Sequence, residues 1–239
     1  MKAILFKDIS QFVTSSTGLL ISCLFLICSG LVFWVLPGNY NILEGGFAQL
    51  SPFFDLAPWL FCLLIPALTM KIFAEEKNGE TLSLIRTLPL SNEQIIWAKF
   101  SGTFIVCLLL ISPLGIYLFS INQLALDASQ IDLAAIIGSF LGLLFSLGSM
   151  ISLSIIACLI SKSNLAALVL GWIICLFMYY GWTYIDLLTE NTSGVSNLGL
   201  YKHYQSISRG VLDLKDLLYF ALVTITVLVI STYRLGHEQ

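Results

Sequence analysis

Six long apolar runs, almost free of charge, dominate this sequence of 239 residues. A charged residue at the centre of a membrane helix costs about 2.5 to 3.5 kcal/mol, so an uncharged run of about 20 residues marks a helical span. Of all residues, 58% are hydrophobic and 10% are charged, whereas soluble domains carry about 25% charged residues. A water-soluble globule is excluded, and we predict an all-α polytopic membrane protein with six transmembrane helices.

The chain is expected to form a single membrane domain over residues 1–239. Its spans are expected near 17–36, 56–73, 100–121, 133–160, 165–187 and 217–233. If the N-terminus lies inside, eight lysines and arginines fall on its side and three on the other. Basic residues favour the cytoplasmic side. We therefore expect both termini and segment 74–99 in the cytoplasm, and segment 189–216 outside.

The N-terminal segment 1–14 has the pattern of an amphipathic helix that lies in the membrane interface. Its polar residues recur at helical spacing and its apolar residues take the opposite face. The polar set is Lys7, Ser10, Gln11 and Thr14, and the apolar set is Leu5, Phe6, Ile9, Phe12 and Val13. The polar face favours a bend before the first span. The alternative is a plain extension of that span.

The pattern of segment 74–99 predicts a short amphipathic helix over 80–88. Leu82, Ile85 and Leu88 recur every three residues between polar positions, and Pro89 ends the pattern. Such a helix, held between two spans, can place its apolar ridge in the groove of a soluble partner. The alternative is a solvated loop with an interfacial helix.

A second helix is expected to begin directly after this segment. Ser91 and Gln94 have the spacing of a capping box, in which each side chain bonds the backbone of the other. We predict that this helix begins at Asn92 and continues into the third span.

Segment 74–99 resembles the corresponding segment of permease subunits of ABC-2 type transporters. That family has Glu-Glu-Lys, then Gly-Thr, an apolar stretch and Pro. The matching residues are Glu75, Glu76, Lys77, Thr81 and Pro89, whereas Gly79 sits one place early and Glu80 replaces the usual glycine. The likeness extends along most of the chain. Segments 41–54 and 56–60 are similar to gliding-motility-associated permeases within the family.

The resemblance implies that this chain is the permease subunit of an ATP-driven exporter in the inner membrane of a bacterium. It also implies that the exporter serves gliding motility or secretion. Its implied partners are an ABC ATP-binding subunit, a second permease copy or sister subunit, membrane lipid and an extracytoplasmic protein. It also implies that 80–88 is the coupling helix. The ATPase-coupling candidates are Glu75, Glu76, Lys77, Leu82, Ile85, Arg86 and Leu88.

The sequence holds no phosphate-binding loop of the form Gly-x-x-x-x-Gly-Lys-Ser/Thr. We therefore expect no catalytic activity in this chain and no bound cofactor, with ATP and magnesium held by the partner. All six cysteines lie in apolar runs, which argues against a disulfide or a zinc site. A net charge of -3 gives no basic surface for nucleic acid.

Segment 189–216 contains the extracytoplasmic gate candidates Arg209, Asp213 and Asp216. The two aspartates have the spacing of an N-cap and an N3 residue, so capping of the last span is the alternative role. His203 and His237 are the only histidines and lie far apart in the sequence, which excludes a catalytic histidine pair.

Other classes of membrane protein remain open. A membrane-embedded enzyme or an ion-coupled secondary transporter needs ionisable residues inside the spans, and we expect none there. A membrane scaffold without transport activity is a further alternative. An ATP-binding subunit encoded beside this chain would favour the ABC interpretation.

Overall fold

The computed structural model describes residues 2–38, 40–41, 51–78, 90–116, 133–189, 194–210 and 213–237. Within these ranges the chain forms helices and turns and contains no strand. Six helical stretches are long and apolar enough to cross a membrane. They are Ser16–Trp34, Ser51–Ala74, Asn92–Ile111, Ala135–Ile160, Asn164–Leu188 and Leu214–His237. The predicted all-α class with six transmembrane helices is confirmed.

The described helices are mostly α-helical, and short π-helical and 3₁₀ turns lie within or beside the spans. The α-helices are α1 (Lys2–Thr14), α2 (Ser16–Trp34), α3 (Ser51–Thr69), α4 (Glu75–Asn78), α6 (Asn92–Ile111), α8 (Leu133–Ile160), α9 (Asn164–Leu176), α10 (Trp182–Leu188), α11 (Leu200–Ser208) and α12 (Leu214–His237). Two π-helical turns, η1 (Met70–Ala74) and η4 (Phe177–Gly181), continue α3 and α9, and the 3₁₀ turn η2 (Ser112–Leu114) follows α6. A further 3₁₀ turn, η5 (Val195–Leu198), precedes α11.

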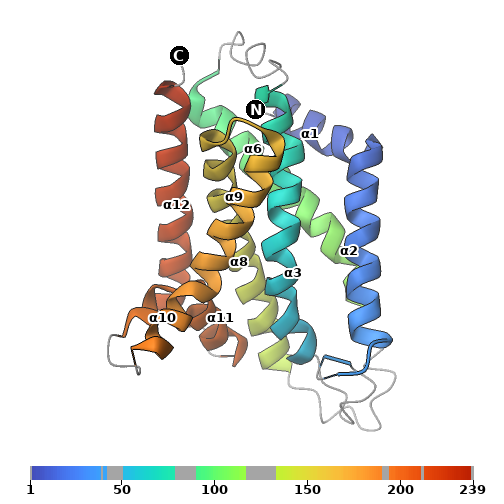
Figure 1. Ribbon diagram of the computed structural model, residues 1–239, viewed down its shortest axis with the longest axis vertical. Coiled ribbons are helices and arrows are strands. Elements are labelled where there is room, and N and C mark those ends of the chain that lie inside the picture. The colour runs from blue at the N-terminus through green and yellow to red at the C-terminus, as the bar shows by residue number, and fades with distance from the viewer. Residues whose placement is uncertain are drawn as a thin grey trace.

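Both chain termini lie at one end of the bundle, and α10 and α11 lie at the other (Figure 1). We call these the terminal end and the distal end. Helix α1 runs across the terminal end, whereas α2, α3, α8, α9 and α12 run between the two ends (Figure 1). Helix α1 is not among the six candidate spans, and its position in the membrane interface stays a prediction.

The bend between α1 and α2 is built by Ser15 and Gly18. Ser15 leaves the helical conformation, with φ -81° and ψ 139°, and its hydroxyl accepts a hydrogen bond from the Gly18 backbone N–H. A Cβ atom on Gly18 would lie 2.1 Å from the Phe12 carbonyl oxygen. Only glycine lets the two helices meet this closely.

Helix α8 is the centre of the bundle and the most buried of the six candidate spans. It packs against α3, α9, α11 and α12. Glycines bring the neighbours close: a Cβ on Gly138 would lie 2.6 Å from the Ile207 carbonyl oxygen, and one on Gly171 would lie 3.0 Å from Ser154 Oγ. The buried hydroxyls of Thr69 and Ser154 hydrogen-bond each other and join α3 to α8. Small residues thus let α8 contact each neighbour directly.

The third span begins earlier in the sequence than its hydropathy predicts. Helix α6 starts at Asn92, not near residue 100, and the expected capping box between Ser91 and Gln94 is present. As a result Lys99 lies within the helix instead of just ahead of it. The second helical span likewise starts at Ser51, ahead of the predicted residue 56.

Candidate functional site

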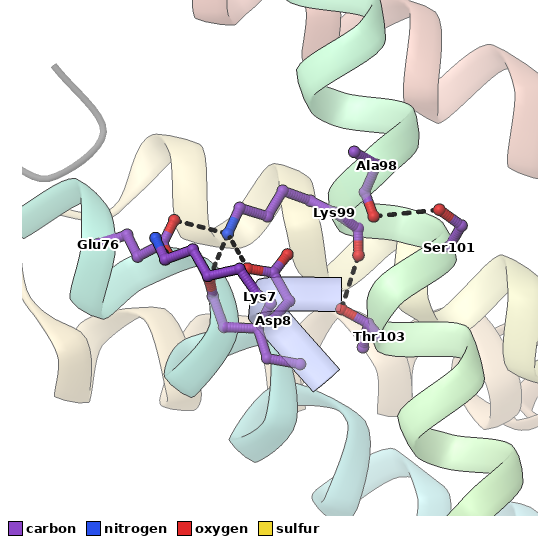
Figure 2. A network of polar contacts seen from close by, with 8 residues as sticks. Lys7, Asp8, Glu76, Ala98, Lys99, Ser101 and Thr103 are labelled. Carbon is purple, nitrogen blue, oxygen red and sulfur yellow. Dashed lines mark hydrogen bonds and ion pairs between the residues drawn. The ribbon is translucent and has the colours of Figure 1, made fainter. Parts of the chain in front are cut away.

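A buried cluster of charged side chains lies at the terminal end, where α1, α4 and α6 meet (Figure 2). Its centre is Lys99, whose side chain is 0% exposed. The Lys99 ammonium lies 2.8 Å from Asp8 Oδ1 and 2.5 Å from Glu76 Oε2. It also donates a hydrogen bond of 3.1 Å to the Ile72 backbone carbonyl. One lysine thus binds three acceptors from two stretches that are distant from it in the sequence: Asp8 in α1, and Ile72 and Glu76 in the continuous stretch of η1 and α4.

Lys7 completes the cluster from its outer side. Its ammonium lies 2.7 Å from Glu76 Oε1, and its side chain is 46% exposed. Glu76 therefore lies between two lysines, one buried and one partly in solvent (Figure 2). We call Lys7, Asp8, Glu76 and Lys99 the charge network. It contains two positive and two negative groups, so its formal charges balance.

The sequence of α1 explains why Asp8 points inward. Ile4, Asp8 and Phe12 are spaced four residues apart, share one face of the helix and are all buried. Asp8 is thus the polar member of an otherwise apolar buried face. Opposite it, α6 has Gly102, on which a Cβ would lie 3.4 Å from Asp8 Oδ2. The Asp8 carboxylate thus lies close to α6 at Gly102.

Only part of the expected apolar face of α1 packs on the bundle. Phe6 and Val13, which we expected on the apolar face, are 74% and 52% exposed. The face that packs on the bundle is centred on Asp8, which the sequence interpretation did not assign to either face. The four-residue spacing from Ile4 to Phe12 was the available signal.

The acceptor carbonyl of Ile72 belongs to the π-helical turn η1. In this turn the Glu75 backbone N–H bonds the Met70 carbonyl, five residues back. Single π turns inside α-helices occur frequently at functional positions. Here the widened turn lies directly beside the buried lysine and leads into α4, which carries Glu76.

Burial makes the charge network sensitive to the loss of any one buried member. Removing one partner of a buried ion pair leaves the other charge desolvated, at a cost of about 3 to 5 kcal/mol. The exposed contact from Lys7 contributes about 1 kcal/mol or less by comparison. The strong interactions are therefore those that tie α1 and α4 to Lys99.

Burial also raises the pKa of Asp8 from 3.8 to about 6. The attraction and hydrogen bond of Lys99 oppose this rise, the negative charge of Glu76 adds to it, and Lys7 lowers it slightly. Desolvation is the largest cause. The Asp8 carboxylate can therefore take up a proton in mildly acidic conditions.

The network joins the helices on both sides of segment 79–89. Helix α4 ends at Asn78 and carries Glu76, and α6 begins at Asn92 and carries Lys99. Residues 79–89 lie outside the described residues, and with them the predicted helix 80–88 and the candidates Leu82, Ile85, Arg86 and Leu88. The ion pair between Glu76 and Lys99 thus fixes the two flanks of the segment against each other.

The remaining candidates of this segment lie on α4. Glu75 forms an ion pair with Lys71, one helical turn earlier, at 2.8 Å. Glu76 belongs to the charge network, and the side chain of Lys77 is outside the described part of the chain. The structure therefore places one of the predicted coupling residues, Glu76, in a buried interaction and adds Lys7, Asp8 and Lys99, which the sequence interpretation missed.

The gate candidates at the distal end do not form one cluster. Arg209 ends α11 and is exposed, and Asp213 is exposed and caps α12 by accepting a hydrogen bond from the Lys215 backbone N–H. Asp216 is buried and lies 2.6 Å from His203 Nδ1. The role of these three residues as a gate stays a prediction.

The expectation that the spans hold no ionisable residue is wrong. Among the described residues, three acidic or basic side chains within the spans are buried: Lys99 in α6, Asp186 in α10 and Asp216 in the first turn of α12. The partners of Lys99 offset the cost of burying its charge. The described residues include no group of three histidine, cysteine or acidic side chains placed to bind a metal ion.

Comparison with known proteins places this architecture in a family. The model of a family described as "ABC-2 family transporter protein" matches residues 13–181. No curated protein matches the chain. The matched range includes four of the six candidate spans in full, most of the fifth and, from the charge network, Glu76 and Lys99. It covers well over half of the sequence, and the chain therefore belongs to the ABC-2 family of transporter proteins.

Proposed function

We propose that this membrane transport component is the permease subunit of an ATP-driven exporter, and that segment 74–99 docks a separate ATP-binding subunit. Family membership supports a transporter permease. The sequence holds no phosphate-binding loop, so the proposal assigns ATP hydrolysis and its magnesium to the partner. A second permease copy or a sister subunit completes the transporter.

The main structural support for the docking proposal is the ion pair of Glu76 with Lys99. It lies at the base of segment 79–89 and ties both flanks of that segment to α1. A force applied to the segment by a partner would therefore reach α1, α3 and α6 together, because buried ion pairs resist separation. A solvated loop would need no such connection.

Two finer parts of the proposal rest on the sequence. The distribution of lysine and arginine supports cytoplasmic termini and a cytoplasmic terminal end in the inner membrane of a bacterium. The likeness of 41–54 and 56–60 to gliding-motility-associated permeases supports a gliding or secretion system. In this orientation the distal end faces outward and is available to an extracytoplasmic partner.

The proposal is tested by purifying the tagged chain in mild detergent from its native membrane, and separately after expression alone in a foreign host. We expect Mg-ATP hydrolysis only in the native preparation, together with a protein that carries a phosphate-binding loop. ATP binding by the chain expressed alone would contradict the proposal. So would a native preparation in which no ATP-binding protein accompanies the chain.

A further inference from the structure

His203 at the distal end contacts two hydrogen-bond acceptors at once. Its Nδ1 lies 2.6 Å from Asp216 Oδ1, and its Nε2 lies 2.8 Å from the backbone carbonyl oxygen of Asn197. The side chains of His203 and Asp216 are 17% and 11% exposed. The contacts join three elements: η5 supplies Asn197, α11 supplies His203 and α12 supplies Asp216.

These two contacts require one proton more than a neutral imidazole beside an ionised carboxylate can supply. A neutral imidazole has a single N–H, and both a carboxylate and a backbone carbonyl only accept. Both hydrogen bonds form when the ring is an imidazolium, or when Asp216 holds the extra proton and donates to Nδ1. In either form the pair, as a unit, binds the added proton.

The aromatic surroundings favour the charged ring. Tyr219 stacks on His203 with ring centroids 3.9 Å apart and 18° between the planes. The face of an aromatic ring attracts a cation. The Tyr219 hydroxyl donates a 2.5 Å hydrogen bond to the Leu198 carbonyl, next to Asn197, and so holds η5 independently of the proton.

We propose that His203, Asp216 and Asn197 form a proton-operated latch, which ties η5 and α11 to α12 when the pair is protonated and releases η5 when the proton is lost. The remaining N–H then stays at Nδ1, because a hydrogen bond to a carboxylate is stronger than one to a neutral carbonyl. Nε2 is left as an acceptor that faces the acceptor carbonyl of Asn197. The break therefore falls between α11 and η5, and the contact between α11 and α12 persists.

Several other described ionisable groups lie on the elements around the latch. On α12, Lys215 neighbours Asp216, and Asp213 caps the helix start. Lys202 of α11 donates to the Ser196 hydroxyl of η5. The face of α8 that packs on α11 carries Gly138, Ser139 and Gly142 and no charge. Tyr201 and Tyr204 of α11 contact Tyr179 and Tyr180 of η4. Asp186 lies on α10, which packs on η5.

All atoms of the latch belong to this chain, so the latch can be tested without ATP or a partner. Histidine is the side chain that ordinarily changes its charge between pH 5 and 8. In the proposed orientation, acid on the outer side keeps η5 tied to α11, and neutral or alkaline conditions loosen η5.

The test uses nitrogen NMR of the full chain in lipid nanodiscs, labelled with ¹⁵N-histidine. The chain has two histidines, so His237→Ala leaves His203 as the only imidazole signal. At pH 8.5 we expect the His203 ring to carry one proton, at Nδ1. At pH 5.5 we expect protons at both Nδ1 and Nε2. The proposal is overturned if the same ring nitrogens carry protons at both pH values.

Amide hydrogen exchange over residues 194–199, corrected for the intrinsic effect of pH, measures the release itself. Loss of one hydrogen bond should raise exchange about three- to tenfold at pH 8.5 relative to pH 5.5. His203→Gln should abolish this dependence, and the control Tyr219→Phe should keep it while raising exchange at both pH values. Equal corrected exchange at the two pH values, or the same dependence in His203→Gln, overturns the latch.

Discussion

The ammonium of Lys99 and the carboxylate of Asp8 lie 2.8 Å apart, both fully enclosed, although 91 positions separate them in the sequence. This ion pair attaches the N-terminal helix α1 to the start of the third span. Through Glu76 the same lysine holds the end of the second helical span. Three helices at the terminal end are therefore connected by one side chain.

The first prediction concerns the stability of this connection. Lys99→Met should lower the free energy of unfolding by about 3 to 5 kcal/mol, because Asp8 and Glu76 would remain buried without their shared cation. Adding Asp8→Asn to Lys99→Met should recover part of the loss, since one unpaired carboxylate is removed. The measurement is the unfolding free energy in detergent for the wild type, both single variants and the double variant.

Lys71→Met is the matched control, because Lys71 forms a partly buried ion pair with Glu75 at the same end of the bundle. It should cost less than Lys99→Met, because Glu75 is 33% exposed and stays partly hydrated when its partner is lost. Equal costs for Lys71→Met and Lys99→Met would mean that burial does not distinguish the two pairs.

The sequence predicts the local features of this structure but not the contacts between residues that are distant in the sequence. The capping box of Ser91 and Gln94 and the six apolar spans are local patterns, and both are confirmed. The burial of Lys99 depends on Asp8 and Glu76, which reach it only after folding. A hydropathy window treats a lysine as a span boundary because it cannot account for a partner that lies far away in the sequence.

The same limit applies at the distal end. The sequence singled out Asp216 as a residue near the start of the last helix, and the structure places it beside His203 of α11. The π turns at Met70–Ala74 and Phe177–Gly181 also have no simple sequence signature. They depend on packing against neighbouring helices, which a single sequence does not reveal.

A second prediction concerns the pH dependence of stability. The pKa of Asp8 is about 6 in the folded chain and 3.8 as an ordinary aspartate, so the folded state binds this proton more tightly than the unfolded state. The associated stabilisation is present below pH 3.8 and is lost as the pH rises through about 6. Its upper bound is about 3 kcal/mol. Unfolding free energies measured between pH 4 and pH 7 should reveal this fall.

Asp8→Asn should remove that contribution to the slope, and Asp213→Asn should not, because Asp213 is exposed at the distal end. If the Asp8 and Asp213 variants retained the wild-type slope equally, the raised pKa of Asp8 would be refuted.

A third prediction concerns the outer member of the network. Lys7→Ala should lower stability by only about 1 kcal/mol or less, because the Lys7 side chain is 46% exposed. Increasing the salt concentration should weaken the Lys7 contribution more than that of Lys99, since exposed charges are screened. A loss for Lys7→Ala as large as that for Lys99→Met would contradict this ranking.

A fourth prediction concerns the orientation of the bundle. The six native cysteines are first replaced, and single cysteines are then introduced at Asn78 or Ser193. A membrane-impermeant thiol reagent should label the cysteine at Ser193 in intact cells and the one at Asn78 only after permeabilisation. The reverse pattern would show that the distal end faces the cytoplasm.

In the proposed function, segment 74–99 docks the ATP-binding subunit, with the predicted ridge of Leu82, Ile85 and Leu88 in the contact. The most direct measurement compares recovery of that subunit with the variants Ile85→Asp and Ser83→Asp at equal membrane expression. Ile85→Asp would place an unpaired charge in the docking groove, and each 1.4 kcal/mol raises the dissociation constant about tenfold. We predict that Ile85→Asp abolishes recovery and that Ser83→Asp, on the polar side, largely preserves it. Equal recovery with both variants would contradict the claim.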